Sequence, residues 1–188
     1  MSKRPSGRVR IIAGAKRGRR LEVPTGAEVR PTSEMVREAV FDVLGPVGGL
    51  RVLDLFAGTG ALGLEALSRG AAHCVFVERD SGVASVLRGN IEVLDYGRTC
   101  RVVVAGYLGA VKALERSGER FDLLFVDPPY RMLAEVEAAL TPLVTRLMSP
   151  EGVMVIEGPR LESTAFGQSP VFEREYGDTK ITMVRPKE

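Results

Sequence analysis

The sequence predicts one α/β domain, built on a mostly parallel β-sheet that carries helices on both faces and ends in an antiparallel hairpin. From about Leu50 onward, short apolar runs alternate with segments whose apolar residues recur at helical spacing. The last two apolar runs instead flank the turn residues Gly177 to Lys180, as in a β-hairpin. The chain has 188 residues, 45% of them hydrophobic, which suffices for one core with a small appendage. Because strand and helix alternate, right-handed crossovers place helices on both faces of the sheet.

The first residues predict a small extension ahead of this domain. Two short apolar patches, Val9–Ala13 and Leu21–Val23, flank the basic run Lys16–Arg20. Such a pattern indicates a β-hairpin with a basic tip that could act as a finger. We therefore expect a basic N-terminal β-hairpin extension over residues 1–30 and the main domain over residues 31–188.

The elements of the main domain follow in order along the chain. A first helix is expected after Thr32 or Ser33, either of which is a good N-cap, and Gly45 with Pro46 ends it. Apolar runs predict strands over Arg51–Phe56, Cys74–Val77, Val102–Ala105, Phe121–Val126 and Val153–Ile156. The expected helices between them are Gly60–Ser68, Asp80–Leu94, one that continues to Leu114 and one that continues to Met148. The closing hairpin is expected to pair Val171–Tyr176 with Ile181–Val184.

The net charge of +2 hides an uneven distribution along the chain. Residues 1–37 hold ten basic and three acidic side chains, a surplus of seven, so the remaining residues carry a net charge of −5. A basic segment on a mildly acidic domain is typical of an enzyme with a polyanion-binding arm, because phosphate contacts supply affinity irrespective of sequence. The alternative is a solvated tail without a partner. The charge pattern favours a nucleic acid as the partner.

Cysteine and histidine are too few to build a metal centre. Cys74 and Cys100 are the two cysteines, each beside an apolar run, and His73 is the one histidine. We expect buried free thiols, a His73 that merely ends a strand, and no metal site.

No apolar run reaches about 18 residues and no secretory signal is recognisable, so we expect a cytoplasmic protein without a membrane span. Nothing in the sequence resembles an oligomer interface, and a monomer is expected.

A glycine-rich turn joins the first strand of the main domain to its helix, where open α/β sheets bind ligands. Gly58, Gly60 and Gly63 fit the pattern of a dinucleotide-binding turn, and Glu78 follows at the distance at which such folds place a ribose-binding acid. Asp54 argues against a dinucleotide, because a carboxylate beside the turn repels a pyrophosphate. The ammonium and sulfonium groups of S-adenosylmethionine would be attracted to it. The turn therefore favours S-adenosylmethionine over a nicotinamide cofactor, with glycines that let the backbone approach the ligand.

The sharpest signal is the run Asp127, Pro128, Pro129 and Tyr130. It follows the apolar strand Phe121–Val126, so it lies at the same edge of the sheet as the glycine turn. The two prolines lack N–H donors and restrict the chain, which holds the aspartate and the carbonyls rigidly. A carboxylate and a carbonyl that accept both N–H bonds of an amino group aim its lone pair at a methyl donor and stabilise the developing charge. Either Asp127 or water accepts the proton, and Tyr130 stacks on a base. The run predicts methylation of an exocyclic amino group, with these four residues as the catalytic set.

The same run resembles the motif of amino-group methyltransferases, in which Asp or Asn precedes two prolines and then Tyr or Phe. Such enzymes act on adenine or cytosine in DNA, guanine in RNA, or glutamine in release factors. The wider sequence is similar to one family, the bacterial 16S rRNA guanine-N2 methyltransferases of the RsmD type. The stretches that carry this resemblance are Val9–Gly14, Arg17–Leu21, Arg30–Thr32, Val36–Phe41, Asp54–Ala71 and Tyr176–Lys180. The resemblance implies the Rossmann-like fold of class I S-adenosylmethionine-dependent methyltransferases, with a seven-stranded sheet.

The resemblance also implies a substrate and the role of each matching residue. The substrate would be one guanine of 16S rRNA, in the 30S subunit or a late assembly intermediate, flipped out because a stacked base cannot reach the methyl donor. The implied cofactor-binding residues are Asp54, Phe56, Gly58, Gly60, Glu78, Arg79 and Gly106. The implied RNA-binding residues are Arg10, Lys16, Arg17, Arg19, Arg20, Arg30, Thr32 and Lys180. Many methyltransferases carry an acidic residue near Gly106 that contacts adenine; a backbone contact would have to replace it here.

Other functions stay open at this point. Methylation of DNA adenine or protein glutamine would use the same catalytic motif but would leave the basic arm without a specific role. A nicotinamide oxidoreductase has no use for the run from Asp127 to Tyr130. A non-catalytic RNA-binding assembly factor would keep the fold without turnover, and its binding to the ribosome would be indifferent to Asp127→Ala.

Overall fold

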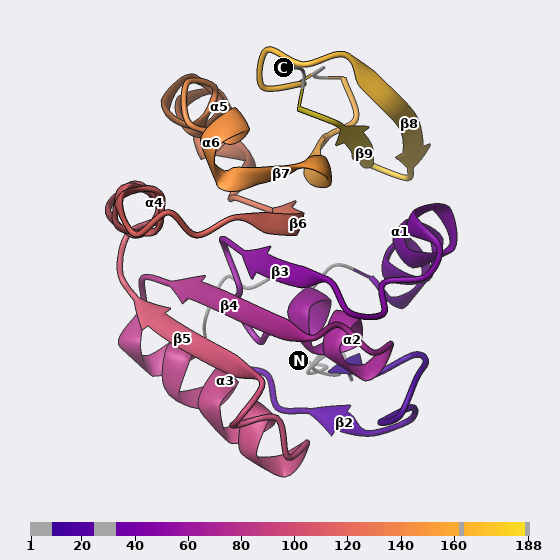
Figure 1. Ribbon diagram of the computed structural model, residues 1–188. Coiled ribbons are helices and arrows are strands. Elements are labelled where there is room, and N and C mark those ends of the chain that lie inside the picture. The colour runs from indigo at the N-terminus through magenta and orange to yellow at the C-terminus, as the bar shows by residue number, and fades with distance from the viewer. Residues whose placement is uncertain (1–8, 25–32, 162–163, 187–188) are drawn as a thin grey trace, which may run out of the picture.

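The computed structural model describes residues 9–24, 33–161 and 164–186 (Figure 1). Seven strands form one sheet in the order β5-β4-β3-β6-β7-β9-β8, and two short strands pair separately. The sheet contains β3 (Arg51–Asp54), β4 (His73–Glu78), β5 (Cys100–Val104), β6 (Phe121–Val126), β7 (Met148–Pro159), β8 (Pro170–Tyr176) and β9 (Thr179–Val184). The separate pair is β1 (Val9–Arg10) and β2 (Arg20–Leu21). The helices are α1 (Glu34–Leu44), α2 (Ala61–Ser68), α3 (Ser81–Val93), α4 (Tyr107–Arg116), α5 (Leu133–Leu140), α6 (Val144–Leu147) and the short 3-10 helix η1 (Tyr130–Met132). Within these described residues, no helix is long and apolar enough to cross a membrane.

The order of the strands confirms the predicted mostly parallel sheet with a closing antiparallel hairpin. Neighbouring strands from β5 to β7 pair in parallel, whereas β9 is antiparallel to both β7 and β8. The chain winds outward from β3 through β4 to β5, then returns to β6 on the other side of β3 and continues to β7. The direction of winding therefore reverses between β3 and β6. In open α/β sheets, ligands bind beyond the carboxyl ends of the strands at such a reversal.

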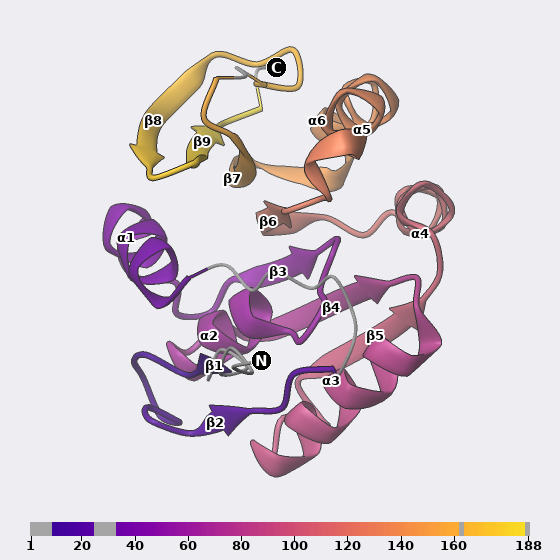
Figure 2. The same cartoon turned by 180° about the vertical axis from the view of Figure 1, so that it is seen from behind.

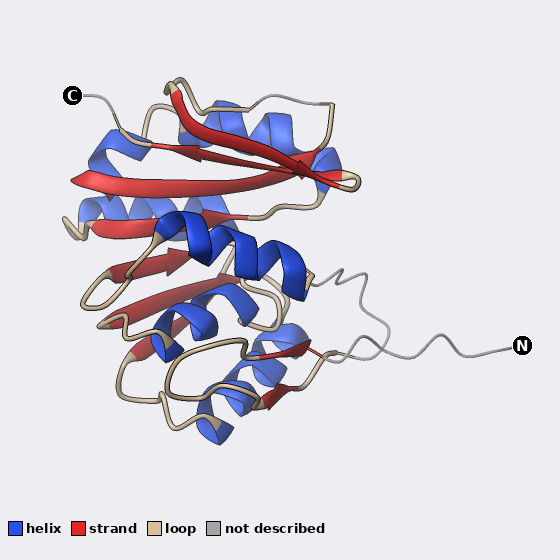
Figure 3. Cartoon of the chain, turned by 90° about the vertical axis from the view of Figure 1, so that its right-hand side faces the viewer, coloured by secondary structure: helices blue, strands red, loops and turns tan. Residues whose placement is uncertain are grey.

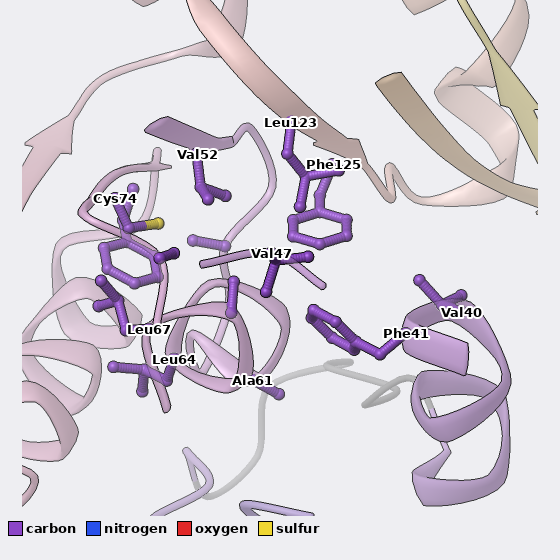
Figure 4. Close-up of a cluster of buried hydrophobic side chains, with 14 of the residues drawn as sticks. Val40, Phe41, Val47, Val52, Ala61, Leu64, Leu67, Cys74, Leu123 and Phe125 are labelled. Carbon is purple, nitrogen blue, oxygen red and sulfur yellow. The ribbon is translucent and has the colours of Figure 1, made fainter. Parts of the chain in front are cut away.

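Helices cover both faces of the sheet, as Figure 1 and Figure 2 show: α1, α2 and α3 lie on one face, and α4, α5 and α6 on the other. The central strands alternate between the two resulting cores. In β6, Leu123 and Phe125 pack with the first set of helices, whereas Leu124 and Val126 pack with the second. Figure 4 shows part of the first core, in which the ring centroids of Phe41 and Phe125 lie 5.9 Å apart. Burial on both faces explains why the strands read as nearly continuous apolar runs.

Helix α1 begins and ends as the sequence predicts. The hydroxyl of Ser33 accepts a hydrogen bond from the backbone N–H of Val36 at 3.2 Å, which confirms Ser33 as the N-cap. Thr32, the other candidate, lies outside the described residues. Gly45 caps the far end with φ of +71°, a conformation that favours glycine, and Pro46 follows it.

The expectation of one helix continuing to Met148 is wrong. The structure has η1, α5 and α6 in that stretch, and Met148 is already the first residue of β7. Pro142 separates α5 from α6, because proline lacks the N–H that a helix needs and its ring clashes with the preceding turn. Met148 is buried and pairs with Phe121 of β6, so its place in the sheet outweighs its helical propensity.

The ends of two further strands differ from expectation. The first strand of the main domain ends at Asp54 rather than Phe56, because the chain already turns towards α2. The last strand begins at Thr179 rather than Ile181, so Thr179 and Lys180 belong to the sheet and not to the turn. Thr179 pairs with Pro159 of β7 and with Tyr176 of β8. This longer pairing extends β9 to the carboxyl end of β7.

The N-terminal hairpin is confirmed, but its tip packs against the domain instead of projecting as a finger. Glu65 of α2, fully buried, accepts hydrogen bonds from the backbone N–H groups of Ile12 at 2.7 Å and Ala13 at 2.9 Å. In the turn, the N–H of Ala15 donates to the carbonyl of Ser68 at 2.7 Å. Figure 3 shows the two short strands beside the helices on one face of the seven-stranded sheet, outside the sheet itself.

Two arginines complete the attachment of the hairpin. Arg37 of α1 is 1% exposed and donates from Nη2 to the carbonyl of Arg10 at 2.7 Å. Arg69 donates from Nε to Glu65 at 2.8 Å, so the buried carboxylate is paired as well as hydrogen-bonded. A buried charge is tolerated when it is both paired with an opposite charge and hydrogen-bonded, and Glu65 meets both requirements. The hairpin is therefore held by specific polar contacts in addition to its apolar residues.

Both cysteines are free thiols, as expected. Cys74 is buried and Cys100 is half-buried, and burial raises the pKa of the Cys100 thiol to about 11. Both cysteines are therefore poor nucleophiles at neutral pH. In the part of the chain that the structure describes, no group of three or more His, Cys, Asp or Glu side chains could hold a metal ion.

Candidate active site

The carboxyl edge of the parallel strands carries most of the expected site residues. Asp54 ends β3, Glu78 ends the neighbouring β4, and Asp127 follows β6 on the other side of β3. The ends of β3 and β6 are held together by a hydrogen bond from the N–H of Leu55 to the carbonyl of Phe125 at 3.1 Å. Adjacent strands are about 4.8 Å apart. The glycine turn after β3 and the Asp127 turn after β6 therefore lie side by side, where the winding of the sheet reverses.

The glycine turn is fastened to the end of β4 through Glu78. One oxygen of this carboxylate accepts from the N–H of Gly58 at 3.0 Å, and the other accepts from the N–H of Asp80 at 2.9 Å. A carboxylate has about four lone-pair sites, so each oxygen keeps acceptor capacity for a diol. Gly60 has φ of +83°, and a Cβ there would lie 2.4 Å from Leu87 of α3. Packing, and not only the approach of a ligand, requires glycine at that position.

Asp54 lies beneath this turn, 2% exposed, and accepts a hydrogen bond from the N–H of Gly63 at 3.1 Å. Burial raises the pKa of the Asp54 carboxyl to about 7, and the charge of Glu78 acts in the same direction, against the lowering effect of the Gly63 bond. Near neutral pH this carboxyl is therefore much less fully ionised than an ordinary aspartate. The ionisation of Asp54 therefore depends on what binds nearby: a cation favours the charged carboxylate, and an anion favours the neutral carboxyl.

An aromatic pair borders the edge on the side of β5. The rings of Phe56 and Tyr107 are 5.4 Å apart at 36°, and both residues are half-buried. Tyr107 donates its hydroxyl to Glu135 at 3.0 Å, which fixes the ring. Gly106 precedes it, with open space around the position of a Cβ, and Arg79 is exposed at the end of β4. The pair offers an apolar surface to a planar ring next to the open backbone at Gly106.

The turn after β6 is rigid and partly open to solvent. Asp127 is half-buried, Pro128 is buried and Pro129 is exposed. The carbonyl of Pro129 accepts from the N–H of Met132 at 2.8 Å, which closes the first turn of η1. Together the two prolines and this bond restrict how the carboxyl of Asp127 can move.

Tyr130 is anchored to the closing hairpin. Its hydroxyl lies 2.7 Å from the hydroxyl of Thr179, which is 6% exposed and begins β9. Lys180 follows, half-buried, and pairs with Gly158 near the carboxyl end of β7. The structure therefore brings Lys180, alone among the described RNA-binding candidates, to the edge that carries Tyr130.

Two basic residues at the tip of the N-terminal hairpin, Lys16 and Arg19, lie away from that edge. The N–H of Lys16 donates to the hydroxyl of Ser68 at 3.0 Å, and Arg19 donates from Nη2 to the carbonyl of Val93 at 3.0 Å. Ser68 and Val93 are the last residues of α2 and α3, which both begin at the carboxyl edge. At 1.5 Å per residue, these contacts lie roughly 12 and 20 Å from it. The exposed cations of the hairpin are Arg10, Arg17, Arg19 and Arg20.

Arg10 is exposed but forms an ion pair with a carboxylate of α1. Its guanidinium lies 3.1 Å from Glu34, and the same side of α1 carries Glu38 and Asp42 along a cavity of about 440 Å³ that Arg17 also lines. Arg69 also lines it, so three carboxylates balance three arginines and the cavity has no surplus of positive charge to attract a polyanion. Neither Asp54 nor Asp127 lines this cavity. The remaining RNA-binding candidates, Arg30 and Thr32, lie outside the described residues.

Sequence reasoning missed Asn90, which links the glycine turn to the N-terminal segment. Asn90 is 3% exposed and donates from Nδ2 to the carbonyls of Thr59 at 3.0 Å and Glu22 at 3.1 Å, and its Oδ1 accepts from the N–H of Glu22 at 2.8 Å. These partners are 31 and 68 residues away along the chain, a separation at which no local pattern signals a contact. Thr179 was missed for the same reason, although its neighbour Lys180 was selected.

Comparison with known proteins places the chain in a family. The family model described as Conserved hypothetical protein 95 matches residues 9–185. YlbH of Bacillus subtilis is 37% identical over 154 residues, which cover 81% of this chain and 83% of that protein. Ribosomal RNA small subunit methyltransferase D of Escherichia coli K12 is 46% identical over 127 residues, 67% of this chain and 62% of that protein.

A solved structure gives the same result for the fold. The yhhF protein of Escherichia coli superposes with a TM-score of 0.81 at 35% identity, covering 95% of this chain and 98% of that one. The likeness extends over both the parallel sheet and the closing strands, so the predicted fold class is confirmed. With this match and the family model in agreement, the chain belongs to the Conserved hypothetical protein 95 family, which includes the small-subunit rRNA methyltransferase D and YlbH proteins.

Proposed function

We propose that this protein transfers the methyl group of S-adenosylmethionine to the exocyclic N2 amino group of one guanine in 16S rRNA. The observation that carries the proposal is the juxtaposition of the glycine turn after β3 with the Asp127 turn after β6. A methyl donor held by the first turn would lie beside an amino group held by the second. The relationship to a named small-subunit rRNA methyltransferase supports rRNA as the substrate.

The residues at the edge fit S-adenosylmethionine. Asp54, whose raised pKa a bound cation would lower, suits a cationic ligand, and Glu78 retains acceptors for the two ribose hydroxyls. Phe56, with Tyr107 behind it, suits the adenine ring beside the open backbone of Gly106. The remaining proposed cofactor residues are Gly58, Gly60 and Arg79. When bound, the cofactor supplies an electrophilic methyl group on a sulfonium.

The Asp127 turn orients the acceptor nitrogen. Asp127 accepts one N–H of the guanine amino group, and a backbone carbonyl of the turn accepts the other. We assign that carbonyl to Pro128, because the carbonyl of Pro129 already accepts from Met132. With both N–H bonds held, the lone pair of the nitrogen points at the methyl donor, and the carboxylate stabilises the positive charge as it develops. The surplus proton then leaves to Asp127 or to water.

The base reaches this turn by flipping out of its stack, and Tyr130 stacks on it. We expect Lys180, whose backbone pairs with Gly158 near the same edge, to meet the flanking backbone phosphate. Lys16 and Arg19, at the tip of the hairpin, contact the far ends of α2 and α3, away from this edge. They would therefore contact a more distant part of a folded RNA, as the 30S subunit or a late assembly intermediate provides, with the protein acting as a cytoplasmic monomer.

Removing two exposed hairpin cations should weaken binding to 30S subunits and flatten its dependence on salt. For the variant Arg17→Ala with Arg20→Ala, the slope of log K against log salt should fall by up to about 2, because each lost phosphate contact removes roughly one released counterion. Binding measured from 50 to 200 mM salt gives the slope.

The matched control removes two exposed cations from α4, on the opposite face of the sheet, as Lys112→Ala with Arg116→Ala. It lowers the net charge equally but leaves the hairpin intact. Equal slopes for the two double variants would show that net charge alone acts and that the hairpin makes no phosphate contacts.

The function itself is tested by methyl transfer from labelled S-adenosylmethionine to 30S subunits from cells that lack the endogenous enzyme. Nucleoside analysis of the 16S rRNA should yield labelled N2-methylguanosine, which identifies cofactor, base and atom together. Label in DNA adenine or protein glutamine would move the substrate to those classes. Binding of subunits and cofactor without any transfer would instead indicate a non-catalytic assembly factor.

A further inference from the structure

We propose that Thr179 is a positioning residue that orients the ring of Tyr130 against the substrate base. The proposal rests on the function proposed above. It assigns a role in the active site to the closing antiparallel hairpin of β8 and β9. Its basis is the 2.7 Å contact between the two hydroxyls, which joins η1 to the first residue of β9 across 49 positions of sequence. The closing hairpin would thus form the wall of the site that faces the base.

Thr179 is itself firmly held. It is 6% exposed and paired on both sides, with Pro159 of β7 and Tyr176 of β8. The hairpin turn before it is fixed by a bond from the N–H of Arg160 to the carbonyl of Asp178 at 3.0 Å. Arg160 also donates from Nε to Glu175 at 2.7 Å. A buried hydroxyl on a doubly paired strand is a fixed reference point for whatever binds to it.

Tyr130 needs such a reference point. It follows two prolines and starts the three-residue helix η1, so its backbone is constrained, but its ring is only half-buried. Stacking on a base requires the plane of the ring to be fixed, and a ring that swings about its side-chain bonds loses that alignment. A hydrogen bond at the far end of the side chain prevents the swing. Leu133, directly after η1, approaches Gly158 of β7 so closely that a Cβ on Gly158 would lie 2.8 Å from it, which keeps the two segments together.

The experiment compares Thr179→Val, which keeps the branched shape but removes the hydroxyl, with Thr179→Ser, which keeps the hydroxyl. Methyl transfer to 30S subunits is measured as kcat and KM, alongside cofactor affinity and thermal unfolding. Thr179→Val should lower kcat by about 3- to 10-fold, the equivalent of one net hydrogen bond. KM for subunits and cofactor affinity should stay unchanged, because the base meets Tyr130 only after the RNA has bound. Thr179→Ser should restore kcat.

A double-mutant cycle with Tyr130→Phe tests the same bond from its other end. Tyr130→Phe should lower kcat about as much as Thr179→Val, and the double variant should be no worse than either. Additive losses would mean that Thr179 and Tyr130 act independently, and a loss of thermal stability or cofactor affinity in Thr179→Val that matches the fall in kcat would mean that Thr179 acts on folding. Either result would overturn the inference. Wild-type kcat in both single variants would also overturn it while leaving the proposed function intact. A wild-type protein that transfers no methyl group to rRNA would overturn both.

Discussion

Asp127→Ala should lower kcat for methyl transfer to 30S subunits by about 10²- to 10³-fold and leave binding of the subunit unchanged. In the proposed mechanism the carboxylate holds one N–H of the amino group and stabilises charge that exists only during transfer. The affinity for the subunit comes instead from phosphate contacts made elsewhere, so the loss should appear in kcat rather than in KM. Single-turnover transfer and subunit binding, measured on the same preparation, separate the two quantities.

Asp127→Asn is the matched control for charge. The amide keeps an acceptor oxygen of the same reach, and its size suits the half-buried position. It loses only the negative charge, so its kcat should fall by about 10-fold, between the wild type and the alanine variant. Equal rates for wild type and Asp127→Ala would remove Asp127 from the catalytic set. A fall in subunit binding or in thermal stability that matches the fall in kcat would assign Asp127 a structural role.

The strands and the edge at which they end could be predicted because their signals are local. A parallel strand buried on both faces reads as an apolar run, and the residue that follows it is placed at the carboxyl edge by topology alone. Asp54, Glu78 and Asp127 were located in this way, and the structure brings all three to one edge. The cap at Ser33 was equally local. One expectation that failed, a helix continuing to Met148, gave too little weight to Pro142, a local signal as well.

The contacts that shape the site could not be predicted, because each joins segments far apart in sequence. Thr179 gives no sign that it meets Tyr130, and Asn90 gives none that it meets Thr59. The basic hairpin shows the same limit. The basic charge of the hairpin was evident from the sequence. The way the hairpin packs on the domain depends on hydrogen bonds from its backbone to Glu65, and no sequence pattern signals these bonds.

Asp54→Asn should stabilise the protein at pH 8 and weaken its binding of S-adenosylmethionine. In the unfolded chain this carboxyl has its ordinary pKa of 3.8, whereas burial raises the pKa to about 7 in the folded protein. Between these values the unfolded state releases a proton that the folded state keeps. The free energy of unfolding therefore falls as the pH rises from about 4 to about 7, by at most about 4 kcal/mol. Asparagine does not titrate, so this loss should be absent in the variant.

The comparison of the two proteins across pH isolates the effect, because all other titrating groups are shared. Thermal or urea unfolding from pH 5 to pH 8 should show the variant gaining on the wild type as the pH rises, by about 1–3 kcal/mol at pH 8. A difference in stability that stays constant with pH would mean that Asp54 titrates near its ordinary pKa in the folded protein, and the burial argument would fail.

Cofactor binding should depend on pH in the opposite way to stability, because it favours the ionised form of Asp54. A cation beside Asp54 favours the ionised carboxyl, so wild-type affinity for S-adenosylmethionine should rise as the pH passes through 7, with release of a proton on binding below that pH. Asp54→Asn should bind about 10- to 100-fold more weakly, with no rise across that range. Calorimetry in buffers of different ionisation enthalpy measures both the affinity and the proton. A more stable variant that binds more weakly would mean that the buried acid is kept for its ligand, at the expense of the folded state without one.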